Sequence, residues 1–508
     1  MNLQPITNVY FIGIGGIGMS ALARYFNANG KVVAGYDRTS TDITEMLEKE
    51  GIKVHFTDEV EAIPASFKNT TTTLVVYTPA IPKDHKEMTF FQENGYQVVK
   101  RSEVLGFITK NSFCLAVAGT HGKTTTSSIL AHIMVESGAS VSAFLGGIAE
   151  NFNSNLVLKG SEYTVVEADE SDRSFLRLSP NIACITSMDA DHLDIYGDEQ
   201  HLIEGFHEFA GKIKPGGSLI VRNGLNIAGE TYGLEDNSDY SFQNIHIVDG
   251  IYHFDFKYTG GIYKDITFMK PGRHNLLNAL AAVAMAVKAG IALEKLLPHL
   301  ATFKGVKRRF SYIIKEKDFV FIDDYAHHPS EINALYQAVA EMYPNTPKTI
   351  VFQPHLFTRT RDFMNDFAKS LSQFNEVILL DIYPARELPI EGITSQVLLE
   401  KITTSKKTLV SKTELIPLLL KKRPQLLLAV GAGDIGAEVA HIKEAMTSDA
   451  IGTTCGAFLG SSTLTTYVES AAGIAEGGRS GLTSAFVGLL FIISLFLSPL
   501  FMLIPSAA

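Results

Sequence analysis

The chain of 508 residues is poor in cysteine and has no excess of basic residues. Its three cysteines, Cys114, Cys184 and Cys455, lack the spacing of metal ligands, and their odd number argues against a disulfide framework. Cys114 and Cys184 lie in apolar runs, so we interpret them as small buried residues of a protein in a reducing compartment. The net charge of −10 comes from interspersed acids and bases. This pattern offers no basic face for a nucleic acid.

The N-terminal segment MNLQPITNVYFIGIGG lacks the basic flank and the uninterrupted apolar region of a signal peptide. A cytoplasmic body that is not membrane-bound is therefore predicted. The C-terminal segment differs, because no charged residue follows Arg479 and residues 485–505 are almost wholly apolar. That stretch is long enough to cross a bilayer, which predicts membrane association through the tail if the tail is real.

Apolar runs typical of strands alternate with helical patterns along the chain, which predicts an α/β fold of parallel sheets covered by helices. At roughly 100 to 200 residues per domain, the length indicates about three domains. Residues 215–270 are rich in Gly, Asn and aromatics and predict an antiparallel insertion. Composition changes sharply near residue 447. The predicted divisions are 1–109, 110–310, 311–446 and a separate hydrophobic module at 447–508.

A first glycine turn follows the strand pattern VYFIGIG. Gly13, Gly15 and Gly18 match G-x-G-x-x-G, and Asp37 follows the next strand. Such glycines let the backbone approach a diphosphate at a helix N-terminus, while the acid meets a ribose hydroxyl. The pattern does not distinguish NAD from a UDP-sugar, and a tight turn without a ligand is the alternative. It predicts a diphosphate site of unspecified kind.

A second glycine turn, GTHGKTTT at residues 119–126, has the composition of a phosphate-binding loop. Gly119 and Gly122 free backbone N–H groups to point inward, Lys123 reaches terminal phosphates and the Thr124 hydroxyl can ligate Mg²⁺. The strict eight-residue pattern needs a glycine where this chain has Val117. A glycine-rich turn with a solvated lysine is the alternative, but strand, turn, Lys-Thr and helix occur in the expected order.

Acidic residues follow two later strand patterns. Glu167, Asp169 and Glu170 come after one strand, and Asp189, Asp191, His192 and Asp194 come after the next. Open α/β sheets place ligands at strand ends, and Mg²⁺ is usually held by one or two carboxylates with phosphates and water. Any one of these acids could instead cap a helix. Two clusters beside one phosphate loop favour metal binding.

Taken in order along the chain, these stretches resemble the Mur ligase family over about residues 5–446. The resemblance is carried by FIGIGGIGMSALA, YTPAI, AGTHGKTTT, VEADESD, DADHLD, GRHNLLNALAA, GVKRRF, DDYAHHPSEI, QPHLFTRTRDF, DIYPARE and GAGDI. It implies a Rossmann-like UDP-sugar domain, a central P-loop ATPase-type domain and a C-terminal Rossmann-like ligase domain. The implied reaction uses ATP and Mg²⁺ to join L-alanine to the muramoyl carboxylate of UDP-N-acetylmuramate through an acyl phosphate, in peptidoglycan synthesis.

The resemblance also implies roles for individual residues in ATP and metal binding. Lys123 would hold the β- and γ-phosphates, Thr124 and Glu167 one Mg²⁺, and His192 a second metal. Asn275 and Asn278 resemble adenine contacts, Arg308 or Arg309 would meet phosphate, and Asp323 or Asp324 the ribose. The full ATP-binding set is Gly119, Thr120, His121, Gly122, Lys123, Thr124, Thr125, Asn275, Asn278, Arg308, Asp323 and Asp324, and the catalytic set is Lys123, His192, Arg309 and His327.

The UDP part would lie on the first glycine turn, with Gly13, Gly15, Gly16, Gly18 and Asp37. An alanine pocket with its carboxylate clamp is implied at Tyr325, His327, His355 and Arg359. Each role has a plainer alternative, since a loop histidine is often only polar and Arg309 could simply pair with an acid. Leu356 stands where many relatives have arginine, so Arg359 must contribute more to carboxylate recognition.

Residues 448–508 resemble a different family, the nucleobase permeases, through SDAIGTTCGAFLGSSTLTTYVESAAGIAEGGRSGLT. Transport needs several helices around a midplane site, so one spanning segment cannot transport. The tail could be a remnant of fusion, frameshift or assembly error, a membrane anchor, or a buried apolar helix. We favour the remnant, because a lone fragment leaves its helix interfaces unpaired.

Two rival functions stay open at this point. One is a related ligase that attaches a preformed peptide to UDP-N-acetylmuramate. The other is a membrane transport component whose soluble part is regulatory. Phosphate release from ATP on adding the sugar nucleotide and L-alanine distinguishes these readings.

Overall fold

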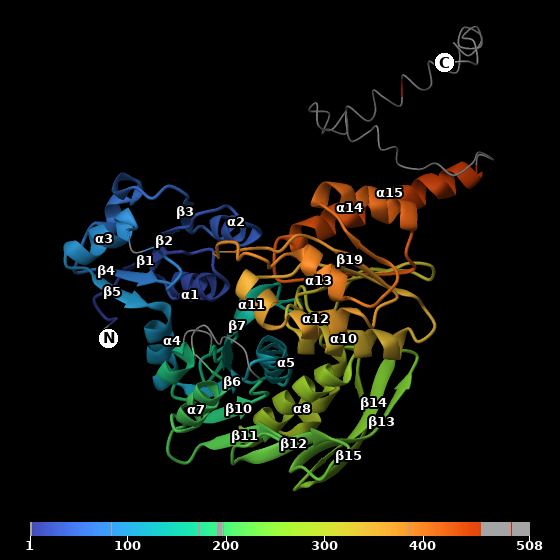
Figure 1. The fold of residues 1–508 in the computed structure, drawn as a ribbon. Coiled ribbons are helices and arrows are strands. Elements are labelled where there is room, and N and C mark those ends of the chain that lie inside the picture. Colours follow the sequence, from blue (N-terminus) through green and yellow to red (C-terminus); the bar gives the residue numbers. More distant parts are fainter. Residues whose placement is uncertain are drawn as a thin grey trace. The chain divides into compact units, whose positions relative to one another are not determined.

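A computed structural model describes residues 3–458, apart from 83, 171–172, 190–195, 197 and 386, and also Leu489. The described chain forms two compact units. The first comprises the chain up to Tyr312 together with Ile322–Thr346 and Lys369–Gln373, and the second comprises the other described residues. Three sheets run through the described chain, in the α/β pattern that the sequence predicts (Figure 1).

The first sheet is parallel, with strand order β3-β2-β1-β4-β5. Because β1 lies between β2 and β4, the strand order reverses at the first glycine turn, where open α/β sheets bind ligands. The strands are β1 (Asn8–Ile12), β2 (Val32–Tyr36), β3 (Lys53–His55), β4 (Thr73–Tyr77) and β5 (Gln97–Lys100). The helices are α1 (Ile17–Ala28), α2 (Asp42–Lys49), α3 (Lys86–Glu93) and α4 (Arg101–Lys110).

The second sheet has ten strands, in the order β15-β14-β13-β12-β11-β10-β6-β9-β7-β8. Side chains of β6 alternate between two cores: Leu115 and Val117 pack in the core shared with α5 and α8, and Ala116 packs in the core of the opposite face. The first of its strands are β6 (Phe113–Ala118), β7 (Val141–Ala149), β8 (Ser154–Leu158), β9 (Tyr163–Glu167), β10 (Ile182–Ile185) and β11 (Ser218–Arg222). Its helices are α5 (Lys123–Glu136), α7 (Glu199–Ala210), α8 (Arg273–Lys288) and α9 (Leu293–Leu296).

The predicted antiparallel insertion is an extension of this sheet. Strands β13 (Tyr240–Val248), β14 (Ile251–Tyr258) and β15 (Gly261–Phe268) pair antiparallel, and β13 pairs parallel with β12 (Glu230–Leu234). Figure 1 shows these long strands as a ribbon curving past α8. Phe242, Phe254 and Phe256 point from the ribbon into the core against α8, so the insertion is anchored by aromatic packing.

The third sheet has the order β16-β17-β21-β18-β19-β20. Its strands are β16 (Ser311–Lys315), β17 (Val320–Asp324), β18 (Lys348–Phe352), β19 (Glu376–Leu379), β20 (Lys407–Leu409) and β21 (Leu426–Val430). The helices of this part are α10 (Pro329–Met342), α11 (Phe357–Asp362), α12 (Met364–Leu371), α13 (Ser395–Lys401), α14 (Lys412–Lys422) and α15 (Ile435–Phe458).

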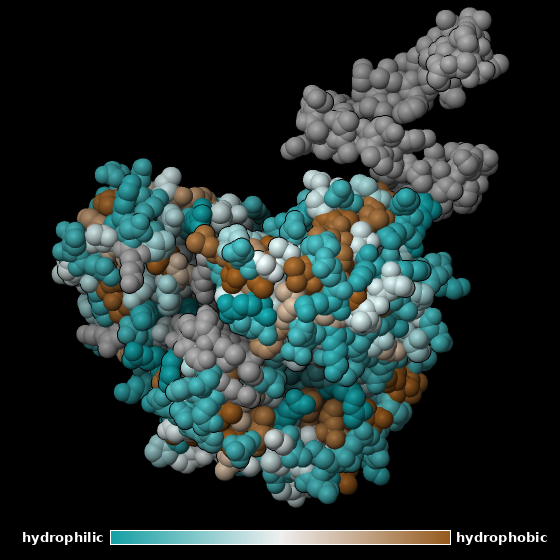
Figure 2. Space-filling model, viewed as in Figure 1, coloured by the Kyte–Doolittle hydropathy of each residue, from teal (hydrophilic) through white to brown (hydrophobic). Residues whose placement is uncertain are grey.

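Helix α15 continues through residue 447, so the change in composition falls inside a helix. Its first half packs in the core of the second unit through Ile435, Val439 and Ile442. The predicted membrane segment at 485–505 lies outside the described residues, apart from Leu489. Within the part of the chain that is described, no helix combines the length and apolarity needed to cross a membrane. On the face drawn in Figure 2, hydrophilic residues cover most of the described surface and hydrophobic ones form small groups.

Candidate active site

The second glycine turn joins β6 to α5 and has the backbone of a tight loop. Gly119 and Gly122 have φ angles of +128° and +83°, which favour glycine. A Cβ at Gly119 would lie 2.2 Å from Thr186 Oγ1, so the loop packs directly on the end of β10. The Thr120 hydroxyl lies 2.9 Å from Ser187 Oγ, and the His121 N–H donates to the same oxygen at 2.8 Å. These contacts therefore fix the loop against the residues that follow β10.

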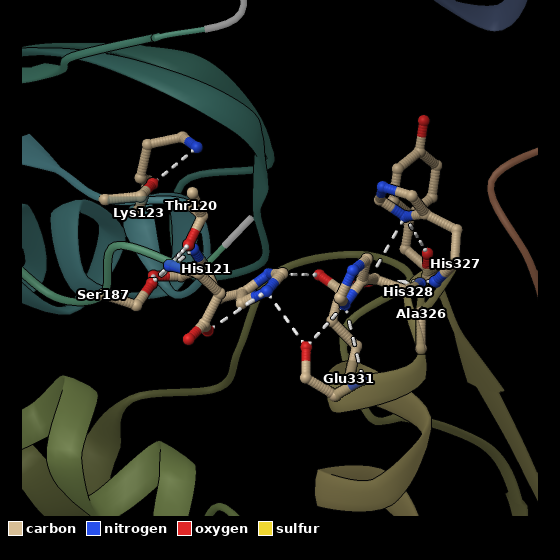
Figure 3. A network of polar contacts seen from close by, with 12 residues as sticks. Thr120, His121, Lys123, Ser187, Ala326, His327, His328 and Glu331 are labelled. Carbon is tan, nitrogen blue, oxygen red and sulfur yellow. Dashed lines mark hydrogen bonds and ion pairs between the residues drawn. The ribbon is translucent and has the colours of Figure 1, made fainter. Parts of the chain in front are cut away.

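Lys123 is the first residue of α5, and its ammonium group is buried among acids. Nζ donates to the Gly119 carbonyl at 2.7 Å and to Glu170 Oε1 at 2.8 Å, and the Glu170 side chain is fully buried. Burial lowers the pKa of Lys123, but Glu170, Asp169 and Glu167 outweigh it and the pKa is raised overall. Lys123 is thus a permanent cation at the loop (Figure 3).

Thr124 and Glu167 lie together beside Lys123, as the predicted metal site requires. The Thr124 hydroxyl donates to Glu167 Oε1 at 3.0 Å, and Glu167 Oε2 accepts from the Gly146 N–H at 2.9 Å. Burial raises the pKa of Glu167, and the charge of Lys123 opposes that rise. Two oxygen donors of this kind suit a hard cation such as Mg²⁺. His192 lies outside the described residues, and within them no three His, Cys, Asp or Glu side chains form a metal cluster.

The first glycine turn is held by the residue predicted to meet a ribose. Asp37 Oδ2 accepts the Gly15 N–H at 2.7 Å, so Asp37 fixes the turn itself. Gly13 has φ of +87°, and a Cβ there would lie 2.8 Å from Thr78. Gly16 is the N-cap of α1. At Gly18 a Cβ would lie 2.5 Å from Arg101 Nη1, which shows how closely this arginine covers the helix N-terminus.

One cavity joins the two glycine turns. The first turn and α1 contribute Ile17 and Gly18 to its wall, and the second contributes residues 120–125. Arg101, Glu167 and Asp169 also line it, as do Arg309, Tyr325 and His327. Arg101 Nη2 lies 3.8 Å from Asp169 Oδ2, so this arginine connects the two sides. We call this space the transfer cavity.

A second cavity adjoins the phosphate loop and contains Asn275 and Asn278 of α8. The two amides lie 3.5 Å apart, as their i, i+3 spacing predicts, and Thr126 donates to Asn278 Oδ1 at 3.3 Å. His274 also lines this cavity, and burial lowers its pKa to about 4, so its ring is neutral. Thr125, Asp324 and Arg309 complete the part of the wall nearest the loop. We call this space the nucleotide cavity.

The charged residues just before β16 and at the end of β17 pair with one another or with nearby backbone and aromatic groups. Arg308 pairs with Asp323 at 3.4 Å, and burial raises the pKa of Asp323 to about 6 against the opposing charge of Arg308. Asp324 accepts the Phe310 and Ala326 N–H groups at 2.7 and 2.8 Å. The guanidinium carbons of Arg308 and Arg309 lie 5.0 and 5.2 Å from the Tyr325 ring centre.

Figure 3 shows a polar network between the phosphate loop and the start of α10, centred on Glu331. Glu331 Oε2 accepts the His327 and His328 N–H groups at 2.9 and 3.3 Å. Its other oxygen lies 3.5 Å from Arg309 Nη1 and 3.5 Å from His121 Nδ1. His121 Nε2 also lies 3.0 Å from Ser330 Oγ. The network brings Arg309 and His327, both predicted catalytic, next to the loop.

His355 and Arg359 belong to the second unit. His355 stacks on Tyr383 with ring centres 5.7 Å apart, and Arg359 lies largely buried in α11. Leu356 is the N-cap of α11 with φ of +71°.

Two residues of this site, Arg101 and Glu331, carry no role in the sequence-based prediction, and a third, Glu170, makes a contact that the prediction did not include. Arg101 follows β5 directly, and its place at the carboxyl end of a strand is a signal that could have found it. Glu331 stands three residues after the helix cap His328, which is the spacing of a capping box. Glu170 was predicted only as one of several acids, and its contact with Lys123 carries no sequence signal.

Models of three Mur ligase domains match the chain in succession. The Mur ligase family catalytic domain matches residues 8–112, the Mur ligase middle domain 117–286, and the Mur ligase glutamate ligase domain 308–433. The chain belongs to the Mur ligase family. A permease family model matches residues 432–508, which confirms the second resemblance seen in the sequence.

The alignments with curated relatives in this family cover almost the whole length of those relatives. A UDP-N-acetylmuramate–L-alanine ligase of Flavobacterium psychrophilum is 60% identical over 444 residues, 87% of this chain and 99% of the relative. The ligase of that name from Christiangramia forsetii is 56% identical over 450 residues, 88% of this chain and all of the relative. These alignments leave the rest of the chain unmatched.

Solved structures of Mur ligases agree with the fold. The crystal structure of UDP-N-acetylmuramate-alanine ligase from Thermotoga maritima has a TM-score of 0.74 at 28% identity and covers 87% of this chain and 99% of its own. A murein peptide ligase from Psychrobacter arcticus has a TM-score of 0.65 at 20% identity over 86% of this chain and 98% of its own. The second likeness is one of fold alone.

Proposed function

We propose that this chain joins L-alanine to the muramoyl carboxylate of UDP-N-acetylmuramate, with ATP converted to ADP and phosphate. The names of the Flavobacterium and Christiangramia relatives support this reaction. The observation that carries the proposal is the transfer cavity, whose wall contains Gly18 of the first glycine turn, Lys123, Tyr325 and His327. A sugar nucleotide, a terminal phosphate and a small amino acid could all reach that space.

In the first step a muramoyl carboxylate oxygen attacks the γ-phosphorus of ATP, and ADP leaves with the electrons of the broken P–O bond. Negative charge grows on the phosphate oxygens during this transfer, and a buried cation at the phosphate loop stabilises it. Lys123 would exchange its contact with Glu170 for the phosphates. We assign the base and ribose of ATP to the nucleotide cavity with Asn275, Asn278 and Asp324.

Thr124 and Glu167 are the described residues that would hold Mg²⁺, and His192 is the proposed ligand of a second metal. A bound Mg²⁺ supplies positive charge that neutralises phosphate oxygens. The residues themselves already fit such an ion, because both side chains offer oxygen and Gly146 leaves room for close approach to Glu167.

The sugar nucleotide would bind with its diphosphate at the N-terminus of α1. Gly15, Gly16 and Gly18 leave backbone at least partly exposed there, Gly13 is buried in the turn, and Asp37 keeps the turn in shape. Arg101 covers the same helix end and faces the transfer cavity. We assign Arg101 to the diphosphate or to the muramoyl carboxylate, because it is a partly buried cation between the two turns.

In the second step the alanine amine attacks the acyl carbon, phosphate leaves, and the amine gives up a proton. His327 is the proposed neighbour of this amine. Its Nδ1 lies 2.9 Å from the Tyr325 carbonyl, which can only accept, so Nδ1 carries the hydrogen and Nε2 holds the lone pair in the neutral ring. We propose Arg359 and His355 as the groups that recognise the alanine carboxylate.

Phosphate release from ATP tests the proposed function directly. Purified chain is mixed with ATP, Mg²⁺, UDP-N-acetylmuramate and L-alanine, and each component is omitted in turn. Release that needs all of them is expected. A parallel reaction replaces L-alanine with a preformed peptide, and faster release with the peptide would favour the rival ligase. No release with any amino acid or peptide would rule out the ligase function.

Substitution of Lys123 by alanine tests the phosphate loop. We expect Lys123→Ala to lower kcat by at least about 1000-fold, because a buried cation that meets the transferred phosphate is lost. Lys159→Ala is the matched control, since Lys159 is exposed, and it should keep normal turnover. Near-normal turnover in Lys123→Ala would contradict the proposed ATP site.

A further inference from the structure

Glu331 occupies the boundary between the two cavities, and it lines both of them together with His121 and Arg309. The two other residues come from distant parts of the sequence, one from the phosphate loop and one from the segment before β16. Glu331 itself lies in the first turn of α10. The three side chains therefore meet where the terminal phosphates of ATP would cross from one cavity to the other, if the proposed function is correct.

The two carboxylate oxygens of Glu331 have separate contacts. Oε2 closes a capping box at the start of α10, accepting the His327 and His328 N–H groups. Oε1 is not needed for that cap, and it lies 3.5 Å from Arg309 Nη1 and from His121 Nδ1. A glutamine could cap the helix equally well. The negative charge is therefore explained by the contacts with basic groups, those of Oε1 with Arg309 and His121 and that of Oε2 with His327 Nδ1 at 3.4 Å.

The charge is also permanent, although the side chain is only 15% exposed. Burial raises the pKa of Glu331, but His327, Arg309 and His121 outweigh it and hold the pKa well below its usual range. An anion next to a triphosphate site repels the nucleotide if nothing else changes. Its presence there requires a compensating role.

We propose that Glu331 is a positioning residue, which holds the Arg309 guanidinium and the His121 imidazole at the boundary of the two cavities so that they can meet the phosphates of ATP. This inference rests on the proposed function for the identity of the nucleotide. Glu331 acts through its two neighbours, and it touches neither substrate. Arg309 in turn is kept flat beside Tyr325, with its guanidinium carbon 5.2 Å from the ring centre.

The sign of a change in ATP affinity tests this role without turnover. Glu331→Gln removes a negative charge and keeps an oxygen acceptor for the helix cap. If Glu331 only repelled ATP, this substitution would tighten ATP binding. If Glu331 positions Arg309 and His121, the substitution weakens ATP binding. We expect calorimetric titration of the full chain with ATP to show affinity reduced about 5-fold or more. Equal or tighter binding in Glu331→Gln would overturn the inference.

Glu414→Gln is the matched control. Glu414 closes a capping box at the start of α14, where its Oε2 accepts the Ser411 N–H at 3.0 Å, and no basic side chain contacts it in the part of the chain that is described. This control should leave ATP affinity and kcat unchanged. A thermal melt of Glu331→Gln should follow that of the control, because both caps keep their acceptor. If wild type binds ATP but releases no phosphate, the proposed function fails while this inference is still tested.

A double-mutant cycle provides the second measurement. If Glu331 acts through Arg309, then Glu331→Gln in an Arg309→Ala background should weaken ATP binding by clearly less than it does in the wild-type background. If the fold-losses of ATP affinity in the two single variants simply multiplied in the double variant, the residues would act independently and the inference would be overturned.

Discussion

Glu87 is a buried acid on a helix that contacts the first sheet, away from both glycine turns in sequence. It lies at the start of α3 with its side chain fully buried, accepts the Tyr10 hydroxyl at 2.7 Å and lies 3.3 Å from His55 Nε2. Burial raises the pKa of Glu87 to about 8, and Asp58 adds to the rise. The acid is therefore protonated in the folded chain at neutral pH and ionised in the unfolded chain. Its contribution to stability is present below about pH 4.5 and is lost as the pH rises through about 8.

Glu87→Gln should reveal this linkage. The glutamine imitates the protonated acid, so the stability of the variant relative to wild type should improve by about 3 kcal/mol between pH 5.5 and pH 8. Urea unfolding of both proteins at the two pH values measures the difference. Burial lowers the pKa of both His55 and His85, but these groups titrate in both proteins and cancel in the comparison. A difference that stays constant with pH would contradict the prediction.

At the scale of elements, the phosphate loop depends on close packing between Gly119 and the residues that follow β10. Gly119 combines φ of +128° with space for no side chain, since a Cβ would lie 2.2 Å from Thr186 Oγ1 and 2.8 Å from the Ser187 backbone nitrogen. Gly138, just after α5, also has positive φ, at +87°, but nothing lies within 4 Å of a Cβ there. A comparison of substitutions at the two positions therefore separates the cost of backbone strain from the cost of steric overlap.

Gly119→Ala should therefore destabilise the chain far more than Gly138→Ala. We expect about 1 kcal/mol from strain alone at Gly138 and at least about 3 kcal/mol at Gly119, where the loop must also move off β10. Denaturant unfolding of both variants measures the costs. ATP binding should be lost only in Gly119→Ala. Equal destabilisation of the two variants would show that the loop accommodates a side chain.

At the scale of the whole chain, the matches to two families meet just before one helix. The glutamate ligase domain matches up to residue 433 and the permease family from residue 432, while α15 runs without interruption from Ile435 to Phe458. The core contacts of α15 involve Ile435, Val439, Ile442 and Met446, all in its first half. The second unit therefore needs the start of the permease-matched stretch for its own packing.

A chain ending at residue 446 should keep the ligase activity and the melting temperature of the full chain, within about 2 °C. It retains each of those four core residues, whereas a chain ending at 434 loses them and should unfold at a clearly lower temperature. Phosphate release and thermal melts of the two shortened chains check this. Loss of activity in the 446-residue chain would show that the tail contributes to function.

Much of this protein could be predicted from local sequence. The strands before both glycine turns, helices α1, α5 and α8, and the pairing of Asn275 with Asn278 depend on spacing within a few turns of chain. The membership of the Mur ligase family was predicted from ordered motifs and is confirmed by the domain models. Lys123 was recognisable because a phosphate loop places its chemistry within eight residues. The assigned roles of the site residues stay predictions.

Other features depend on contacts between residues far apart in the sequence, which no local pattern encodes. Asp37 was predicted to meet a ribose, and that role stays a prediction; the fold adds a contact with the Gly15 N–H that no local pattern encodes. In its local sequence Glu331 is an ordinary helix cap, and only the fold places Arg309 and His121 beside its second oxygen. The sequence by itself determined which segments form strands, turns and a phosphate loop, because those depend on nearby residues. Only the tertiary structure decided which charges neutralise each other, because burial and distance are set by the packing of the whole first unit.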